Sequence, residues 1–337
     1  MRNRRSSFSW AAFAAVVLIL LAITSGILIF MKKNRNKALF NADLNRDYVA
    51  VIGKSESSSF WISVSSGARA AAAEYNLDMR FMAPDSEEDY VSQNKMIGDA
   101  IDDGAKAIIF SAIDYNANAS AINRAIEAGI PVVVIDSDVN SAGVSCRIMT
   151  DNYEAGRMAG LRALENNDGK LVIGVVNYDI NSANGQERER GFCDVIRESG
   201  RDCDIYTINC SSTKEDAYAG TCRLLEEHSD INTIAALNEL MSLGSGYAIR
   251  DLGLEEEVDI YAFDSNVISV GMLETGEIDG LVVQNPYSMG YLGVETAYQL
   301  INGIHLPSDH IDTTTTYVNY ANMYDIDIQR MIFRFDE

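Results

Sequence analysis

Polar and aromatic side chains stand directly after most of the β-branched runs of the chain, where they could bind a polar ligand. Ligands of open parallel sheets bind beyond the carboxyl ends of the strands, so residues that follow strands are the first candidates for a site. These residues are Ser58, Ser59, Phe60, Trp61, Ser111, Asp114, Asp136, Ser137, Asp138, Asn177, Asn238, Glu239, Asp264, Gln284 and Asn285. Carboxylates and amides bind hydroxyl groups, and an aromatic ring covers the apolar face of a sugar. The set predicts a site for a neutral ligand with many hydroxyls, although each Asp, Asn or Ser alone could equally cap a helix or form a turn.

Strand-like and helix-like segments alternate along most of the chain. Strands are expected at 47–52, 77–82, 107–110 and 132–135, and in a second series at 171–176, 205–208, 233–237, 260–263 and 281–283. Helical spacing of apolar residues is found at 60–75, 87–101, 117–128, 152–165, 186–199, 215–227, 241–252 and 287–301. This alternation predicts an α/β protein with two doubly wound parallel-sheet domains.

Composition and charge argue against a disordered chain and against a nucleic-acid-binding protein. The 337 residues are 47% hydrophobic and 23% charged, which is typical of large packed cores rather than of disorder. Residues 1–40 hold seven basic and no acidic side chains, which leaves 20 basic and 49 acidic ones in residues 41–337, a net charge of −29. A body with this charge would repel phosphate backbones, so a nucleic-acid partner is excluded.

The N-terminal segment has the pattern of a membrane anchor. No charged residue occurs between Ser6 and Met31, and the apolar stretch Ala11 to Met31 is long enough to cross a bilayer core of about 30 Å. Residues 1–35 are therefore predicted to form a cytoplasmic tip and a transmembrane signal anchor, with a linker at 36–45. A cleaved signal peptide and a buried core helix are the alternatives. Basic residues flank both ends, so the count of positive charges does not set the orientation.

Neither the cysteines nor the histidines form a catalytic or metal-binding pattern. The five cysteines are Cys146, Cys193, Cys203, Cys210 and Cys222. None has the paired CxxC spacing of a zinc site, and the pattern leaves open free buried thiols or one or two disulfides. The three histidines, His228, His305 and His310, have no nucleophile at motif spacing. We therefore expect no catalytic residue, no metal and no cofactor.

Seven short sequence motifs, in order along residues 58–295, resemble those of a known family. They are SSFW at 58–61, EAGIPVVVID at 127–136, TDNYEAGRMAG at 150–160, ERERGF at 187–192, ALNELMSLG at 236–244, YAFDSN at 261–266 and VVQNPYSMGYLGVE at 282–295. The chain resembles the type I periplasmic solute-binding proteins of ribose and galactose type, which share their fold with the sugar-sensing domains of lactose-repressor-type regulators.

The resemblance implies a set of ligand-binding residues. These are Ser58, Phe60, Trp61, Ser111, Asp136, Ser137, Arg190, Asn238, Asp264 and Gln284. The aromatic pair would pack on the sugar ring, Asp136 and Arg190 would bind hydroxyls, and the last three residues would close the site from the second domain. The chain departs from the ribose-type pattern at Ser137 in place of an arginine, Ser111 in place of an asparagine and Glu239 in place of an aspartate. These departures leave the identity of the sugar open, and a ligand that differs from ribose or is larger is compatible with them.

The resemblance also implies how the two domains join. A three-strand hinge would divide the chain into an N-terminal lobe, 46–150 plus 285–311, and a C-terminal lobe, 151–284 plus 312–337. A ligand that touches both lobes would favour the closed state.

The implied function is binding without catalysis. We expect a single-pass membrane protein, with its sugar-binding domain outside the cytoplasm at the cell surface or in the periplasm, that delivers a sugar to the permease of an ABC-type importer. The alternative is a receptor component that presents its closed form to a membrane sensor histidine kinase of a two-component system. A DNA-binding repressor is excluded, because a membrane span is predicted where a helix-turn-helix would have to be.

Overall fold

The computed structural model describes residues 46–332 together with Thr24, Gly26, Met31 and Lys32. The chain divides into two units, Met1–Asp47 and Tyr48–Glu337, and both sheets belong to the second. No helix among the described residues is long and apolar enough to span a bilayer. Apart from the four residues named above, the predicted anchor at 1–35 and linker at 36–45 lie outside the described residues.

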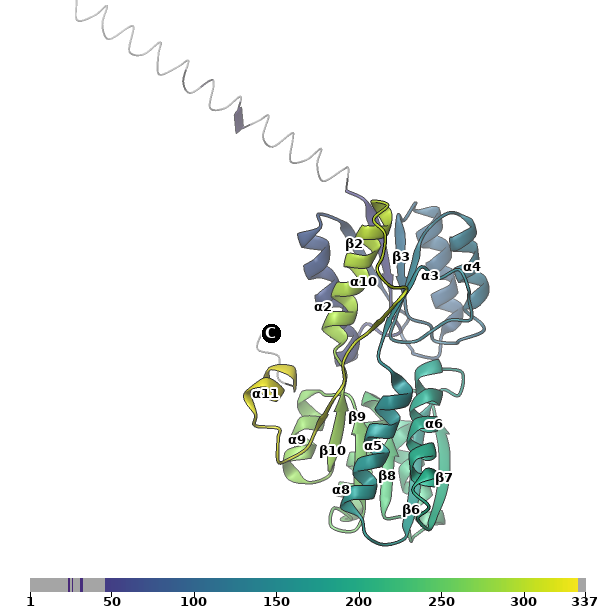
Figure 1. Cartoon of the computed structure of the whole chain (residues 1–337), viewed down its shortest axis with the longest axis vertical. Coiled ribbons are helices and arrows are strands. Elements are labelled where there is room, and N and C mark those ends of the chain that lie inside the picture. Colours follow the sequence, from purple (N-terminus) through teal and green to yellow (C-terminus); the bar gives the residue numbers. More distant parts are fainter. Residues whose placement is uncertain (1–23, 25, 27–30, 33–45, 333–337) are drawn as a thin grey trace, which may run out of the picture. The chain divides into compact units, whose positions relative to one another are not determined.

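The first sheet has six strands, all paired in parallel (Figure 1). They are β1 (Tyr48–Ile52), β2 (Asp78–Met82), β3 (Ala107–Phe110), β4 (Val132–Ile135), β5 (Cys146–Met149) and β11 (His310–Asp312), in the order β11-β5-β4-β3-β1-β2. The helices α2 (Ser59–Glu74), α3 (Tyr90–Asp102), α4 (Ala119–Glu127) and α10 (Pro286–Ile301) pack around it. We call this sheet and its helices the first lobe.

The second sheet repeats this topology with one exception. Its strands are β6 (Leu171–Tyr178), β7 (Cys203–Cys210), β8 (Thr233–Ala236), β9 (Asp259–Phe263), β10 (Gly280–Val283) and β12 (Thr316–Val318), in the order β12-β10-β9-β8-β6-β7. The edge strand β12 runs antiparallel to β10, whereas the other pairs are parallel. The helices are α5 (Asn152–Asn166), α6 (Ala183–Glu198), α7 (Lys214–Glu227), α8 (Glu239–Leu252) and α9 (Val267–Thr275), and the short α11 (Ile326–Ile332) follows β12. We call this the second lobe.

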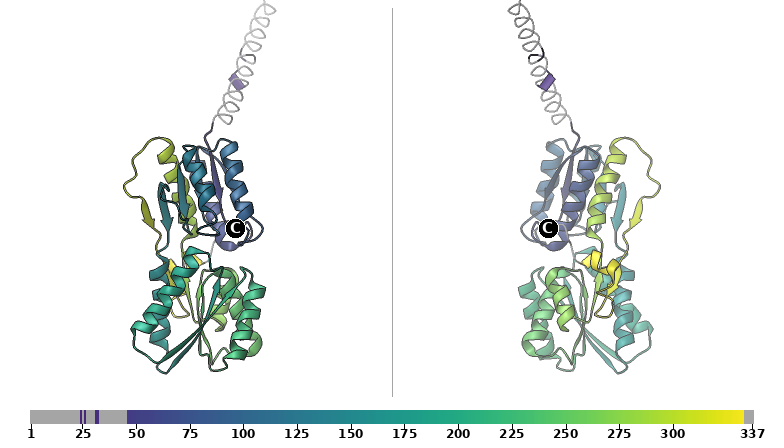
Figure 2. Two further views of the ribbon diagram at one scale, coloured as in Figure 1. Left: turned by 90° about the vertical axis from the view of Figure 1, so that its right-hand side faces the viewer. Right: turned by 90° about the vertical axis from the view of Figure 1, so that its left-hand side faces the viewer.

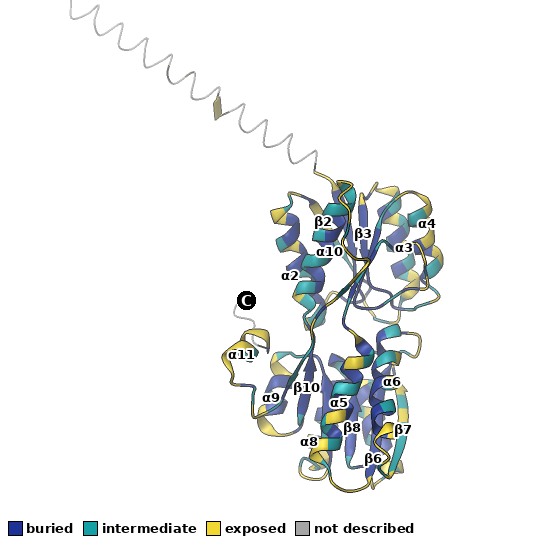
Figure 3. Ribbon diagram, viewed as in Figure 1, coloured by how far each residue is buried: buried dark blue, intermediate teal, exposed yellow. Residues whose placement is uncertain are grey.

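Burial on both faces explains the uniformly apolar strands. In β1, Val49 and Val51 face the core under α2 and α10, whereas Ala50 and Ile52 face the core under α3 and α4. Helices cover both faces of each sheet (Figure 2), and the central strands are buried throughout (Figure 3). Parallel sheets covered in this way contain continuous hydrophobic runs, which are the runs seen in the sequence.

The prediction of an α/β protein with two parallel-sheet domains is confirmed, apart from the antiparallel edge strand β12. The short strands β5, β11 and β12 and the helices α9 and α11 were not among the predicted elements, and β12 makes the second sheet mixed rather than parallel. The chain passes from one sheet to the other between β5 and α5, between β10 and α10, and between β11 and β12. The five cysteines are free thiols in the structure, which favours the first of the two alternatives.

Candidate functional site

A small cavity is lined by residues that come from the strand ends and adjoining segments of both lobes. Its lining consists of Lys54, Ser58, Phe60, Trp61, Glu87, Asp136, Tyr178, Asn184, Arg188, Asn238, Glu239, Leu240, Asp264 and Gln284. The two lobes touch across it, since the backbone N–H of Phe60 donates to Glu239 Oε2 at 3.2 Å and Asn184 Nδ2 donates to Asp136 Oδ1 at 3.1 Å. The cavity therefore lies at the carboxyl ends of the strands, between two walls that come from different lobes.

Asp136 and Asp264 occupy matching places in the two lobes. Asp136 directly follows β4 and Asp264 directly follows β9, which take corresponding positions in the two strand orders. Both have left-handed backbone conformations, with φ of 59° and 67°, and Asn76 is the one other described non-glycine residue with positive φ. Such conformations cost energy in L-residues and concentrate at binding sites, where the surrounding structure enforces them. The two aspartates therefore share an uncommon backbone conformation as well as a place in the cavity lining.

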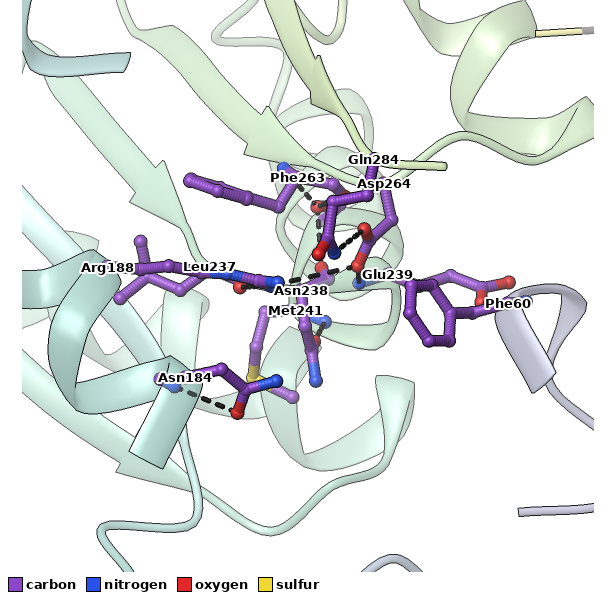
Figure 4. Close-up of polar contacts among 12 residues, drawn as sticks. Phe60, Asn184, Arg188, Leu237, Asn238, Glu239, Met241, Phe263, Asp264 and Gln284 are labelled. Atoms are coloured by element: carbon purple, nitrogen blue, oxygen red, sulfur yellow. Dashed lines mark hydrogen bonds and ion pairs between the residues drawn. The ribbon is translucent and has the colours of Figure 1, made fainter. Parts of the chain in front are cut away.

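Each aspartate is fixed by neutral donors and by one cation. Asp264 accepts from Gln284 Nε2 at 2.6 Å and from the backbone N–H of Glu239 at 3.1 Å (Figure 4). Asp136 accepts from Ser111 Oγ at 3.1 Å, in addition to Asn184. The cations are Lys54, 3.5 Å from Asp136, and Arg188, 3.9 Å from Asp264. Carboxylate oxygens accept more than one hydrogen bond, so both groups retain capacity for a ligand.

Arg188 is the buried cation of the second lobe. Its Nε donates to Asn152 Oδ1 at 2.9 Å and its Nη1 donates to the carbonyl oxygen of Leu237 at 2.7 Å. The guanidinium lies over the Phe263 ring, 4.7 Å from its centroid. Nη2 is buried and has no hydrogen-bond partner among the described residues. The side chain is therefore fixed through Nε and Nη1, whereas the Nη2 group of this cavity-lining residue is left without a hydrogen bond.

Arg188 lines the cavity, whereas Arg190, the arginine predicted from the sequence, does not. The Arg190 side chain is 59% exposed, forms an ion pair with Glu187 and lies over the Tyr153 ring. Residues two apart on a helix point in directions about 200° apart, so only one arginine of ERER can face the cavity. The sequence alone does not show which one, because both positions carry the same residue type.

The predicted serines have different placements. Ser58 lines the cavity and caps α2 by accepting the backbone N–H of Trp61. Asn238 has the same double role at α8, where its Oδ1 accepts the backbone N–H of Met241. Ser111 and Ser137 are buried behind the cavity rather than in its lining, and Ser111 supports Asp136. At Ser58 and Asn238 the helix cap is therefore observed, and a role in ligand binding stays a prediction.

The aromatic pair is asymmetric. Phe60 is partly buried, whereas Trp61 is 2% exposed and belongs to the core under α2. The two rings meet edge to face, with centroids 5.2 Å apart, and Trp61 Nε1 donates to Glu87 Oε1 at 3.1 Å. Trp61 is therefore a core residue that touches the cavity with one edge, and its removal would also destabilise the lobe.

Besides Arg188, five residues of the lining were not predicted from the sequence: Lys54, Glu87, Tyr178, Asn184 and Leu240. Lys54 closely follows β1 and Tyr178 ends β6, so the strand-end rule could have found both. Asn184 accepts from Tyr178 Oη at 2.7 Å while it donates to Asp136. Glu87 lies in the connection between β2 and α3, among acidic residues that resemble an ordinary solvated edge.

Burial shifts the pKa of two cavity carboxyls upward. The pKa of Glu87 is raised to about 7, first by burial, while Lys54 acts in the opposite direction. The pKa of Asp264 is raised to about 6, again first by burial, with Arg188 opposing the shift. Desolvation disfavours the charged form of a carboxyl, and the neighbouring carboxylates add to this effect. Ionisation of the Glu87 and Asp264 carboxyls is therefore less favourable than in water.

Replacement of Glu87 by Gln should stabilise the chain at pH 8 but not at pH 5. The folded-state pKa of about 7 lies above the ordinary value of 4.5, so between these values the folded state keeps a proton that the unfolded chain has lost. Stability then falls as the pH rises through this window, and Gln removes that loss, on the order of 1–3 kcal/mol at pH 8. Thermal unfolding of both proteins at the two pH values measures the difference. The exposed neighbour variant Asp85→Asn is the control, and parallel pH curves for the Glu87 variant and the unaltered chain would contradict the assignment.

A family model, described as a periplasmic binding protein domain, matches residues 49–304. The ribose import binding protein RbsB of Bacillus subtilis is 25% identical over 72% of this chain and 78% of its own length. The structure of a sugar transporter from Clostridium phytofermentans is 32% identical, with a TM-score of 0.74, and the match covers 82% of this chain and 99% of that one. A solute-binding protein from Agrobacterium vitis with bound D-fucose is 27% identical, with a TM-score of 0.82, over 85% of this chain and 100% of that one.

The fold, the position of the cavity and these similarities agree with one another. The matched family binds solutes outside the cytoplasm and performs no catalysis. The chain therefore belongs to the type I periplasmic binding proteins, in the ribose- and galactose-type sugar-binding family of ABC transport.

Proposed function

We propose that the chain binds a sugar in the cavity between its lobes and delivers it to the permease of an ABC-type importer. The observation that carries the proposal is a pair of buried polar atoms on residues that line the cavity, Arg188 Nη2 and Gln284 Oε1. Neither has a hydrogen-bond partner in the part of the chain that the structure describes. One is a donor and the other an acceptor, and a sugar hydroxyl can satisfy either. Buried polar groups are rarely left unpaired in a folded protein, so these two atoms point to a polar ligand.

Closure of the lobes is the proposed binding mechanism. Asp136 and Lys54 belong to one wall and Asp264 and Arg188 to the other, so a ligand that contacts both pairs stabilises the closed arrangement. The moving bodies would be the two lobes, close to the predicted ranges 46–150 plus 285–311 and 151–284 plus 312–337. Asp312 belongs to the first lobe, because it pairs with Met149 in the first sheet. The three chain passages between the sheets would form the hinge.

The N-terminal segment would hold this binding domain at the membrane. We propose that residues 11–31 are not cleaved and anchor the chain in the membrane, with the binding domain outside the cytoplasm. The supporting observations are the absence of charge across this stretch and the basic residues on both sides of it.

Replacing Asp136 or Asp264 with Ala should weaken sugar binding by about 1–3 kcal/mol each, which corresponds to roughly 5- to 150-fold in Kd. Each change removes an acceptor and leaves buried donors without a partner. The full chain, purified in a mild detergent, is screened by thermal shift against pentoses and hexoses, and the best sugar is then titrated by calorimetry.

Asp138→Asn is the matched control for this experiment. Asp138 follows the same strand as Asp136 but bonds to Arg147 at 2.9 Å and is not in the cavity lining, so binding should stay unchanged. Unaltered affinity in both alanine variants would show that the sugar binds elsewhere. Delivery is tested by measuring uptake of the identified sugar in cells that lack this chain, and uptake should be lost. Normal uptake together with loss of a transcriptional response to the sugar would favour the sensing role.

A further inference from the structure

The cavity lining carries more negative than positive charge. It contains the four carboxylates Glu87, Asp136, Glu239 and Asp264 but only the two cations Lys54 and Arg188. Each aspartate lies within ion-pair distance of one cation, at 3.5 Å for Lys54 and Asp136 and 3.9 Å for Arg188 and Asp264. The two glutamates are therefore in excess.

Neutral donors alone hold the two glutamates. Glu87 accepts from Trp61 Nε1 at 3.1 Å. Glu239, which is 8% exposed, accepts from the backbone N–H of Phe60 at 3.2 Å and from Asn266 Nδ2 at 2.9 Å. Within the part of the chain that the structure describes, neither glutamate forms an ion pair. Lys54 also acts on Glu87 electrostatically, but its close contact is with Asp136.

The glutamates lie near enough to affect each other. The charge of Glu239 is one of the causes that raise the pKa of Glu87, and Phe60 links them, because its backbone N–H binds Glu239 while its ring contacts Trp61. Glu239 is buried and Glu87 is partly buried. A carboxylate that is removed from water without a cation beside it is costly, and the cost is removed by protonation or by an added cation. Gln284 Oε1 adds a further buried acceptor without a partner on the same lining.

We propose that the ligand is a sugar with a protonated amino group, whose ammonium binds Glu87 and Glu239. This rests on the proposed sugar-binding function and narrows its ligand class. An ammonium group has three donors and no acceptor, which complements a lining rich in carboxylate and amide oxygens. Arg188 Nη2 and the aspartates remain for the hydroxyls, so the lining provides for both parts of such a ligand.

Calorimetry on the full chain with matched sugars tests this. The probes are D-glucosamine, D-galactosamine, D-mannosamine and 6-amino-6-deoxy-D-glucose, each beside its neutral parent sugar, and the N-acetyl derivatives of the first three. At least one amino sugar should bind about tenfold or more tightly than its parent, and than its N-acetyl form where one is tested. Glu87→Gln and Glu239→Gln should each reduce this preference by about tenfold. The preference is the ratio of the Kd of the neutral parent to the Kd of the amino sugar, so a loss of affinity that affects both sugars equally leaves it unchanged.

Asp85→Asn is the charge-matched control, because it removes an exposed carboxylate near Glu87 that does not line the cavity. The amino-sugar preference should survive this change. Binding of a neutral sugar with no preference for any amino sugar would overturn the inference and leave the sugar-binding function intact. A preference that persists in both glutamine variants would also overturn it. Failure of all amino, N-acetyl and neutral sugars, on a folded chain, would overturn the proposed function as well.

Discussion

Replacement of Arg188 with Ala is expected to abolish sugar binding and to destabilise the second lobe. The guanidinium is 1% exposed, and it fixes Asn152 and the carbonyl oxygen of Leu237 while it compensates the charge of Asp264. Removing one partner of a buried ion pair costs about 3–5 kcal/mol, because the remaining charge stays buried without compensation. The loss should appear as a lower melting temperature and as no detectable heat on titration with the sugar that the unaltered chain binds.

Arg190→Ala is the matched control, since Arg190 lies on the same helix, two residues further on, with an exposed side chain. We expect normal affinity and a melting temperature within about 1–2 °C of the unaltered protein, as for most surface changes. Arg188→Lys keeps the charge without the fork of donors and should fold with weakened binding. If Arg190→Ala lost binding and Arg188→Lys did not, the assignment of the two arginines would have to be reversed.

Gly67→Ala should destabilise the first lobe by about 3 kcal/mol, or roughly 5–10 °C in melting temperature. Gly67 of α2 packs against α10, and a methyl group there would overlap the carbonyl oxygen of Tyr287. The contact is reciprocal, because a methyl group on Gly290 of α10 would overlap the carbonyl oxygen of Val64. Backbone cannot move aside as a flexible side chain can, so the two helices would have to separate.

Gly98→Ala provides the comparison within the same lobe. Gly98 lies inside α3, and a methyl group there meets nothing within 4 Å. Ala should stabilise a helix interior relative to Gly by about 0.5–1 kcal/mol. Differential scanning calorimetry on the three proteins measures both effects, and equal melting temperatures for Gly67→Ala and Gly98→Ala would show that α2 and α10 do not pack so closely in solution.

Local patterns in the sequence were sufficient for most of the scaffold and for much of the candidate site. Apolar runs such as VVVI at β4 need no partner to be recognised, because strands buried on both faces are uniformly hydrophobic. The rule that ligands bind at strand ends then led to Asp136 and Asp264, which the structure places in one cavity. Short elements gave no such signal, and β11 and β12, at three residues each, are strands only because a neighbouring strand is present to pair with them.

The sequence by itself determined the fold class, the acidic body and the strand-end polar set, because each depends on composition or on spacing along the chain. The tertiary structure decided which face of α6 meets the cavity, and so distinguished Arg188 from Arg190. It also showed that Trp61 belongs to the core and that Glu87, from the loop before α3, lines the same cavity as Glu239 of the other lobe. Pairing, burial and net charge of a cavity depend on residues brought together from distant segments, and no local pattern records those contacts.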